Sequence, residues 1–118
     1  MTCATDTTQA TLREWFAEAC ENGEADPRLF QRGEPRYPWA APLDVRVGDE
    51  VLVAQARNLS NQGIGFLIRF PLADQTQVWI RRAYEEAWIP ALIEHCTKTV
   101  DKFRVGAVFM PGENQAGQ

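Results

Sequence analysis

The second half of the chain alternates short apolar segments with polar breaks, and this punctuation limits the fold more than any other feature. Between Gly63 and Phe70 the apolar side chains fall on every second residue, which is the period of a half-buried strand. The same argument predicts strands over residues 43–47, 50–57, 63–70, 77–82, 88–97 and 103–110. Six short strands at even spacing predict an antiparallel barrel or sandwich.

One amphipathic helix is expected before the strands, from about Thr8 to Glu21. Its apolar stripe at helical spacing consists of Leu12, Trp15, Phe16, Ala19 and Cys20. Its polar face consists of Arg13, Glu14, Glu18 and Glu21. Asn22-Gly23 is a helix stop. We expect strand 88–97 to have two largely apolar faces, with Ile89, Ala91, Ile93 and His95 sharing one of them. One face is expected to line the barrel interior and the other to receive the helix.

Charge and cysteine content exclude several classes of protein. The 118 residues fit one domain, with a net charge of -4 and a pI of about 5.0. An acidic surface disfavours nucleic-acid polymers, so an anion site has to be built from clustered arginines. The three cysteines, Cys3, Cys20 and Cys96, offer neither a disulfide framework nor a metal pair. Without a secretory signal or a bilayer-spanning run, we expect a cytoplasmic protein that does not insert into membranes.

The segment between the helix and the first strand is rich in both breakers and arginines. Residues 22–42 contain two glycines and four prolines, which argue against regular structure. The same segment carries Arg28, Arg32 and Arg36, and the aromatic residues Tyr37 and Trp39. An irregular segment with many arginines and aromatics is a candidate binding loop.

Two short motifs carry the functional prediction. Arg32-Gly33-Glu34-Pro35-Arg36 lies in the loop, and Asn58-Leu59-Ser60-Asn61-Gln62-Gly63 lies between the second and third expected strands. A hairpin fills the interval, so the motifs are expected to face each other at one barrel end. Arginine forks suit phosphate oxygens and the guanine edge, and each charge-assisted hydrogen bond contributes about 1.5–3 kcal/mol. Gly63 allows either a positive φ or a close backbone approach to a ligand.

Arg-x-x-x-Arg followed by Asn-x-Ser-x-x-Gly at this distance resembles the paired motif of the PilZ family. The apolar strand after Gly63 and the closing Phe103–Phe109 segment are similar to the family's pattern, and the resemblance covers about residues 28–110. It implies an all-β core, a six-stranded antiparallel β-barrel, with the N-terminal α-helix as an addition. The expected division is 1–27 for the tail and helix, 28–110 for the barrel and 111–118 for a polar tail.

The resemblance also implies a ligand, the bacterial second messenger cyclic di-GMP. Arg32 and Arg36 would contact its phosphates and guanine, Asn58 and Ser60 would hydrogen-bond a guanine, and Gly63 would shape the turn. Arg28 lies outside the motif and would add positive potential. No cofactor, metal or catalytic group is expected. Binding would order the arginine loop beside the helix and so signal to a protein partner.

Structural explanations and rival functions stand beside this prediction. The arginines also fit a solvated loop, and Asn58 and Ser60 fit a turn that caps its own backbone. His95-Cys96 is expected to be structural because strand neighbours point to opposite faces, and Trp79 and Trp88 are expected to pack in the core or against the helix. The alternative functions are a nucleotide-independent PilZ-type adaptor and a small flavin-binding barrel, for which no catalytic group is present.

Overall fold

The computed structural model of the chain describes residues 4–22 and 35–110. Within them lie one helix and seven strands, whose bounds are α1 (Ala4–Asn22), β1 (Tyr37–Pro38), β2 (Pro42–Val47), β3 (Glu50–Leu59), β4 (Gly63–Ile68), β5 (Gln77–Arg82), β6 (Ile89–Lys98) and β7 (Phe103–Phe109). All six predicted strands are present. The two-residue strand β1 was not expected, because it forms where Pro35 and Pro38 had argued against regular structure.

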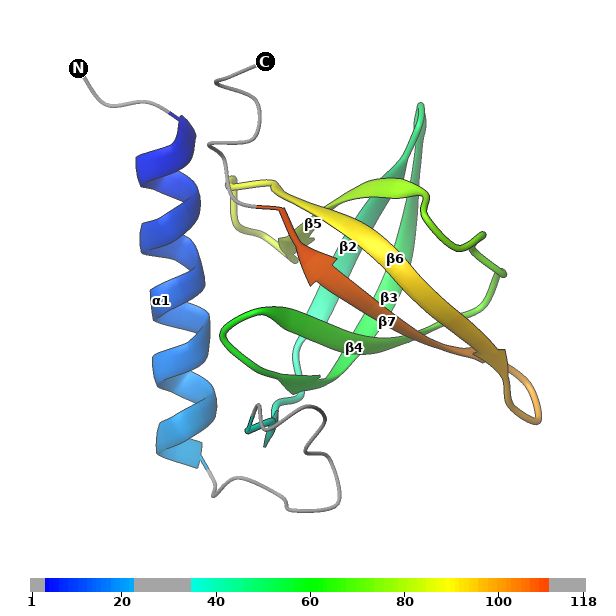
Figure 1. Ribbon diagram of the computed structural model, residues 1–118, viewed down its shortest axis with the longest axis horizontal. Helices are drawn as coiled ribbons and strands as arrows, with labels where there is room; N and C mark the ends of the chain where they lie inside the picture. The colour runs from blue at the N-terminus through cyan, green and yellow to red at the C-terminus, as the bar shows by residue number, and fades with distance from the viewer. Residues whose placement is uncertain (1–3, 23–34, 111–118) are drawn as a thin grey trace.

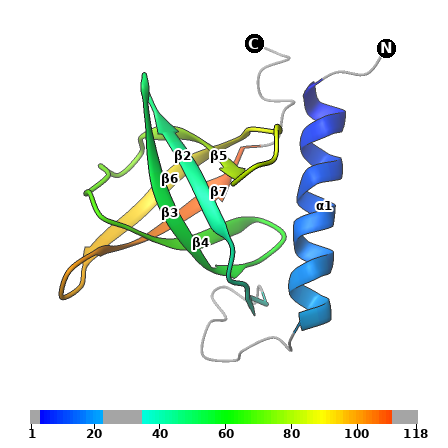
Figure 2. The same ribbon diagram turned by 180° about the vertical axis from the view of Figure 1, so that it is seen from behind.

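The strands form one closed antiparallel barrel (Figures 1 and 2). The order around it is β3-β2-β5-β6-β7-β4, and pairing of β4 with β3 closes the ring. Strand β1 is the extra strand and pairs with the end of β3, where Pro38 lies opposite Asn58. Closure removes the free sheet edges that an open sheet of this length would expose. The predicted six-stranded barrel with one N-terminal helix is therefore confirmed.

The barrel interior is filled by the aliphatic side chains that the alternation placed on one face. Ile64, Phe66 and Ile68 of β4 are buried, as predicted. Phe70, the last member of that predicted series, is 57% exposed because β4 ends at Ile68. The other large side chains that are fully buried inside the barrel are Leu43, Val45, Leu59, Val78, Ile80, Ile89, Ile93 and Val105.

Two β-bulges interrupt the alternation of buried and exposed residues. In β3 the register shifts between Ala56 and Asn58, and in β6 it shifts between Ile93 and His95. A bulge inserts one unpaired residue, so the following side chain turns to the opposite face. The expectation that His95 shares a face with Ile93 is therefore wrong, because Ile93 is buried and His95 is exposed beyond the β6 bulge.

Helix α1 lies across one end of the barrel (Figures 1 and 2). The expectation that it packs along the outer face of β6 is wrong. Trp15 and Ala19 of the predicted stripe are buried, and Cys20 is exposed. Trp15 stacks against Trp39 with ring centres 5.5 Å apart, and Phe16 meets Tyr37 edge-on at 5.4 Å. The helix therefore packs on the segment that contains β1 and Trp39.

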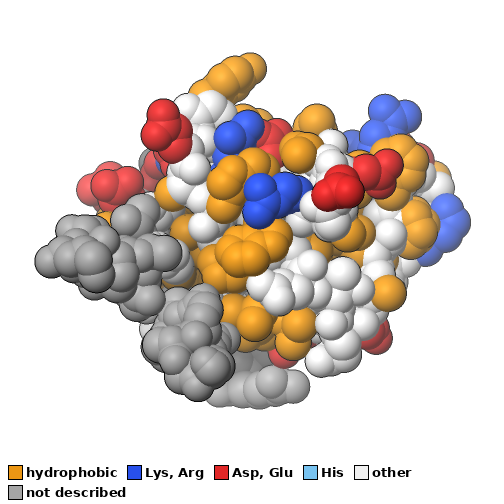
Figure 3. Space-filling view, turned by 90° about the horizontal axis from the view of Figure 1, so that it is seen from above, with side chains coloured by type: hydrophobic (Ala, Val, Ile, Leu, Met, Phe, Trp, Pro, Cys, Tyr) orange, Lys and Arg blue, Asp and Glu red, His pale blue; other side chains and the backbone are white. Residues whose placement is uncertain are grey.

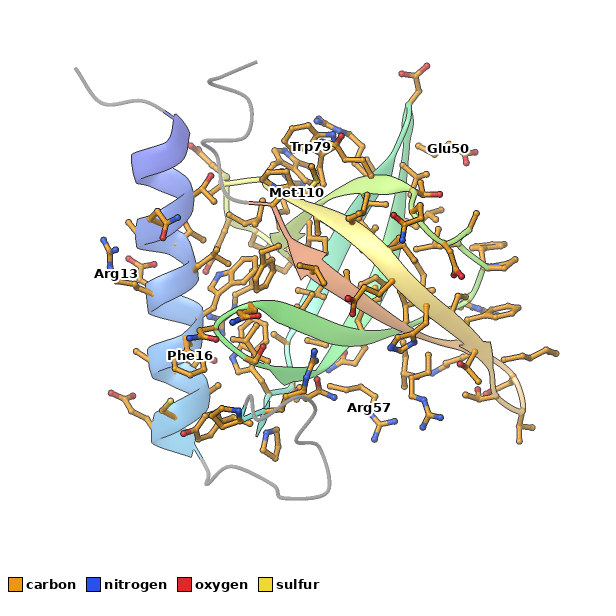
Figure 4. All side chains as sticks on the ribbon, viewed as in Figure 1. Arg13, Phe16, Glu50, Arg57, Trp79 and Met110 are labelled. Carbon is orange, nitrogen blue, oxygen red and sulfur yellow. The ribbon has the colours of Figure 1, made fainter. Side chains whose placement is uncertain are left out.

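Polar contacts fix the helix at this end, and they involve a residue expected to face solvent. Glu18 accepts hydrogen bonds from both terminal nitrogens of Arg82, at 2.6 and 2.8 Å, and one from the Trp39 indole at 3.2 Å. The Trp15 indole donates to Glu85 at 3.3 Å. The assignment of Glu18 to the free polar face was wrong, whereas Arg13 is exposed as predicted and points away from the barrel (Figure 4).

Trp79 and Trp88 lie half-buried on the outside of the barrel, whereas they were expected to pack in the core or against the helix. The guanidinium carbon of Arg46 lies 5.5 Å from the Trp79 ring centre and 4.9 Å from that of Trp88. Arg81 lies 4.5 Å from the Trp88 ring centre and forms an ion pair with Asp44 at 2.9 Å. Figure 3 shows a face on which hydrophobic and Lys/Arg side chains are intermixed. We call Arg46, Trp79, Arg81 and Trp88 the Trp–Arg face.

Candidate functional site

The two predicted motifs meet through a direct hydrogen bond. The Arg36 Nη1 donates to Asn58 Oδ1 at 2.9 Å. Arg36 lies immediately before β1, and Asn58 lies near the end of β3, opposite Pro38 of β1. The antiparallel pairing of β1 with β3 therefore brings the loop motif to the turn motif. Arg28 and Arg32 lie outside the residues that the structure describes.

Ser60 builds the turn that follows Asn58. Its Oγ accepts hydrogen bonds from the backbone N–H groups of Gln62 and Gly63, at 3.1 and 3.0 Å, and lies 3.4 Å from the Gly63 carbonyl oxygen as a donor. Ser60 is buried, and its backbone N–H donates to the Gly63 carbonyl oxygen at 2.9 Å. These bonds are those of a serine that caps its own turn, which was the structural explanation for Ser60. They hold the chain between β3 and β4 in one shape.

Gly63 is required by a close approach between strands. A Cβ on Gly63 would lie 2.5 Å from the carbonyl oxygen of Ala107 in β7, well inside van der Waals contact. Gly48 is the glycine with a positive φ within the described ranges, so the positive-φ alternative for Gly63 was wrong. The same Cβ would lie 3.6 Å from Nη2 of Arg36, so the guanidinium rests over a position with no side chain.

Two further glycines continue this surface on the outside of the barrel. Gly65 of β4 pairs with Gly106 of β7, so their Cβ directions lie on one face, about 5 Å apart. A Cβ on Gly65 would lie 2.8 Å from Asn58 Oδ1, and a Cβ on Gly106 would nearly overlap Nε2 of His95. We call Gly63, Gly65 and Gly106 the glycine floor, on which the Arg36, Asn58 and His95 side chains lie.

The two β-bulges explain how polar side chains reach this floor. Alternation from Ala54 and Ala56 would turn Asn58 inward, and the bulge after Ala56 turns it outward over Gly65. Sequence reasoning missed His95, Gly65 and Gly106 as neighbours of the site. A glycine in each of two adjacent strands was the available signal, because strand glycines often mark close approach of another group.

Electrostatic contacts beside the site connect it to helix α1. The hydrogen bonds that Glu18 accepts from Arg82 hold the pKa of this carboxyl below its ordinary value, and the Trp39 indole acts in the same direction. The charge of the neighbouring Cys20 and partial burial raise the pKa of the Tyr37 phenol, next to Arg36. The cationic Arg57 is exposed and projects from the barrel on the opposite side from Trp79 (Figure 4).

The arrangement suits recognition of an anionic, planar ligand. Arg36 provides a fork of donors, and Asn58 provides both a donor and an acceptor for a base edge. Within residues 4–22 and 35–110 there is no cluster of His, Cys, Asp and Glu side chains that would hold a metal ion. In the same described part of the chain, no helix is long and apolar enough to cross a membrane.

Comparison with known proteins identifies the family. No curated protein sequence matches the chain. The family model described as the PilZ domain matches residues 30–118, which is more than half of the chain. This range includes both motifs from Arg32 onward, all seven strands and all three residues of the glycine floor. The chain therefore belongs to the PilZ domain family.

Proposed function

We propose that this PilZ domain is a receptor for cyclic di-GMP and that the ligand binds on the outer barrel surface at Arg36 and Asn58. Membership of the family supports this proposal. The observation that carries it is the 2.9 Å hydrogen bond between Arg36 and Asn58, because it unites the two motifs in one place. Arg32, and with a weaker role Arg28, would approach the same ligand from the loop.

The division of labour among the motif residues follows from their contacts. The guanidinium of Arg36 would bind a phosphate or the O6/N7 edge of a guanine, for which its planar fork is suited. Asn58 would read a base edge beside it. Ser60 and Gly63 would contribute chiefly by shape, since the Ser60 hydroxyl is engaged within the turn and Gly63 admits the Ala107 carbonyl.

Isothermal titration calorimetry with cyclic di-GMP tests the proposal. Wild-type protein is expected to bind at micromolar concentrations. Arg36→Ala is expected to weaken binding at least tenfold, because a charge-assisted hydrogen bond contributes about 1.5–3 kcal/mol. Arg13→Ala is the matched control, because it removes an exposed arginine on the far side of α1. No heat from wild-type protein, or unchanged affinity in Arg36→Ala, would sink the proposal.

The output is proposed to pass through the helix to a protein partner. Arg36 adjoins Tyr37, which contacts Phe16, and Trp39 stacks on Trp15. A ligand that changes the position of Arg36 would thereby alter the seat of α1. The same proposal makes the protein a non-catalytic adaptor in the bacterial cytoplasm, as expected from its sequence.

A second candidate function, a nucleotide-independent adaptor, is favoured by the Trp–Arg face. Tryptophan and arginine are enriched at the energetic centres of protein interfaces, and Trp79 and Trp88 are both partly exposed. The same titration separates the candidates. An adaptor of this kind gives no heat with cyclic di-GMP and retains its partner in nucleotide-free buffer.

A further inference from the structure

We propose that His95 is a ligand-contacting residue of this site and that its imidazole forms a stacking surface for a base of the bound nucleotide. The inference rests on the proposed function, because it concerns the same site and the same ligand. His95 belongs to neither motif and lies on a strand that carries no motif residue. It is the single histidine of the chain.

The strand register places His95 in one row with Asn58. Asn58 pairs with Gly65, Gly65 pairs with Gly106, and Gly106 pairs with His95. The row crosses β3, β4, β7 and β6. Paired residues in antiparallel strands project to the same face, so Asn58 and His95 approach the glycine pair from its two sides.

The absence of side chains at the glycines lets the imidazole lie on the backbone. A Cβ on Gly106 would clash with Nε2 of His95 and lie 2.7 Å from its Cε1, so the ring covers the position that a side chain would take. His95 is nevertheless exposed. A ring that rests on backbone and remains exposed offers one flat side to a ligand, next to Asn58 and Arg36.

Other roles for this histidine do not fit its surroundings. It is not part of the core, since the β6 bulge turns it outward. It belongs to no metal-holding cluster, and no side chain forms a hydrogen bond or ion pair with its ring, in the part of the chain that the structure describes. Bases stack readily on histidine and other aromatic rings. Arg36 and Asn58 would then hold the polar edge of the ligand while His95 holds its flat face.

Three variants test the inference by cyclic di-GMP titration. His95→Ala is expected to weaken binding about tenfold, because stacking on an aromatic ring is lost. His95→Phe keeps a flat ring and is expected to bind within about twofold of wild type. Gly106→Ala is expected to weaken binding as His95→Ala does, because the new methyl group displaces the imidazole. Thr97→Ala, exposed on the same strand, is the control.

A second readout reports on stacking directly. Because the chain has one histidine, its imidazole proton signals are unambiguous in an NMR spectrum. Stacking on a purine is expected to move them upfield on addition of cyclic di-GMP. Denaturation midpoints of the variants identify any loss of affinity that reflects unfolding.

The outcomes separate this inference from the proposed function. If wild-type protein and Thr97→Ala bind, Arg36→Ala fails to bind, and His95→Ala binds like wild type without a shift of the imidazole signals, the role of His95 is refuted alone. Equal losses in His95→Ala and His95→Phe would refute stacking. If wild-type protein does not bind, the proposed function and this inference are both overturned.

Discussion

Two outer faces of the barrel carry arginines, but the surfaces beneath those arginines differ. On the glycine floor, Arg36 lies over Gly63 and bonds to Asn58. On the Trp–Arg face, Arg46 lies over two indole rings, and Arg81 contacts both Trp88 and Asp44. Figure 4 shows Trp79 of the Trp–Arg face on one side of the barrel. Arg57, which directly precedes Asn58 in β3, lies on the other side.

The difference means that the groups an arginine contacts are set by the surface beneath it. A floor without side chains keeps polar groups close to the backbone and leaves their outer sides for a small, flat, anionic ligand. Indole rings raise the surface and engage the guanidinium groups by cation–π contact, which gives a broad surface of the kind found at protein interfaces. Sequence alone does not distinguish an arginine on the glycine floor from one on the Trp–Arg face, because it does not show which residues lie beneath the guanidinium.

The largest expected effect is on the glycine floor itself. Gly63→Ala is expected to lower the free energy of unfolding by about 3 kcal/mol, because the new Cβ would lie 2.5 Å from a backbone carbonyl of β7 that has no side-chain freedom. Gly65→Ala is the matched variant and is expected to cost about 1 kcal/mol, because the obstacle is the Asn58 side chain, which can rotate. Urea denaturation measures both, and equal costs would contradict the distinction between a backbone and a side-chain obstacle.

A smaller effect is expected on the Trp–Arg face. Arg46→Ala removes two cation–π contacts and is expected to lower the free energy of unfolding by about 1.5 kcal/mol. Its affinity for cyclic di-GMP is expected to stay at the wild-type value, in contrast to Arg36→Ala. Denaturation and calorimetry on the same preparation check both expectations. Weakened nucleotide binding in Arg46→Ala would show that the two faces are not separate sites.

The smallest effect concerns Glu18, which attaches α1 to the barrel by bonding Trp39 after β1 and Arg82 at the end of β5. Glu18→Gln is expected to lower the free energy of unfolding by about 1 kcal/mol at neutral pH, since this ion pair is partly exposed. The folded protein holds the pKa of Glu18 below 4.5, so the ion pair stabilises fully above that pH. The stabilisation is lost as the pH falls through the lowered pKa.

Denaturation at two pH values checks the prediction for Glu18. The difference between wild type and Glu18→Gln is expected to be present at about pH 7 and to shrink at about pH 3. Glu14→Gln, on the exposed side of α1, is the control and is expected to match wild type at both pH values. A difference that persists in acid would mean that Glu18 acts through packing and not through its charge.

Most of the barrel could be predicted from the sequence, because alternation and turn residues are local signals. The strand Gln77–Arg82 begins and ends at the predicted residues, and Ile64, Phe66 and Ile68 face the core as expected. Strand β1 could not be predicted, because its two residues are extended only through pairing with β3. The place of Trp79 could not be predicted either, since an indole suits the core and an arginine-covered surface equally well.

Only part of the candidate site could be predicted from the sequence. Arg36 and Asn58 were expected to lie together because a hairpin returns the chain, and the structure brings them together. His95 was not expected there, because its position depends on a bulge, and a bulge arises from pairing between strands that periodicity within one strand does not report.

The paired bulges also have a genetic consequence. Each bulge makes one residue of the candidate site point outward, where strict alternation from the preceding core residues would make it point inward. A β3 that kept Arg57 but paired without its bulge would follow strict alternation, and the amide of Asn58 would then point into the barrel. The site would then be lost although every residue assigned to it remained encoded. Loss of the single codon for Arg57 would, in contrast, leave Asn58 pointing outward, because Asn58 would directly follow the inward-facing Ala56. When two sequences of this family are aligned, matching motif residues are therefore not enough to transfer a binding function. The position of the bulge, which decides whether the motif side chain points outward, must match as well.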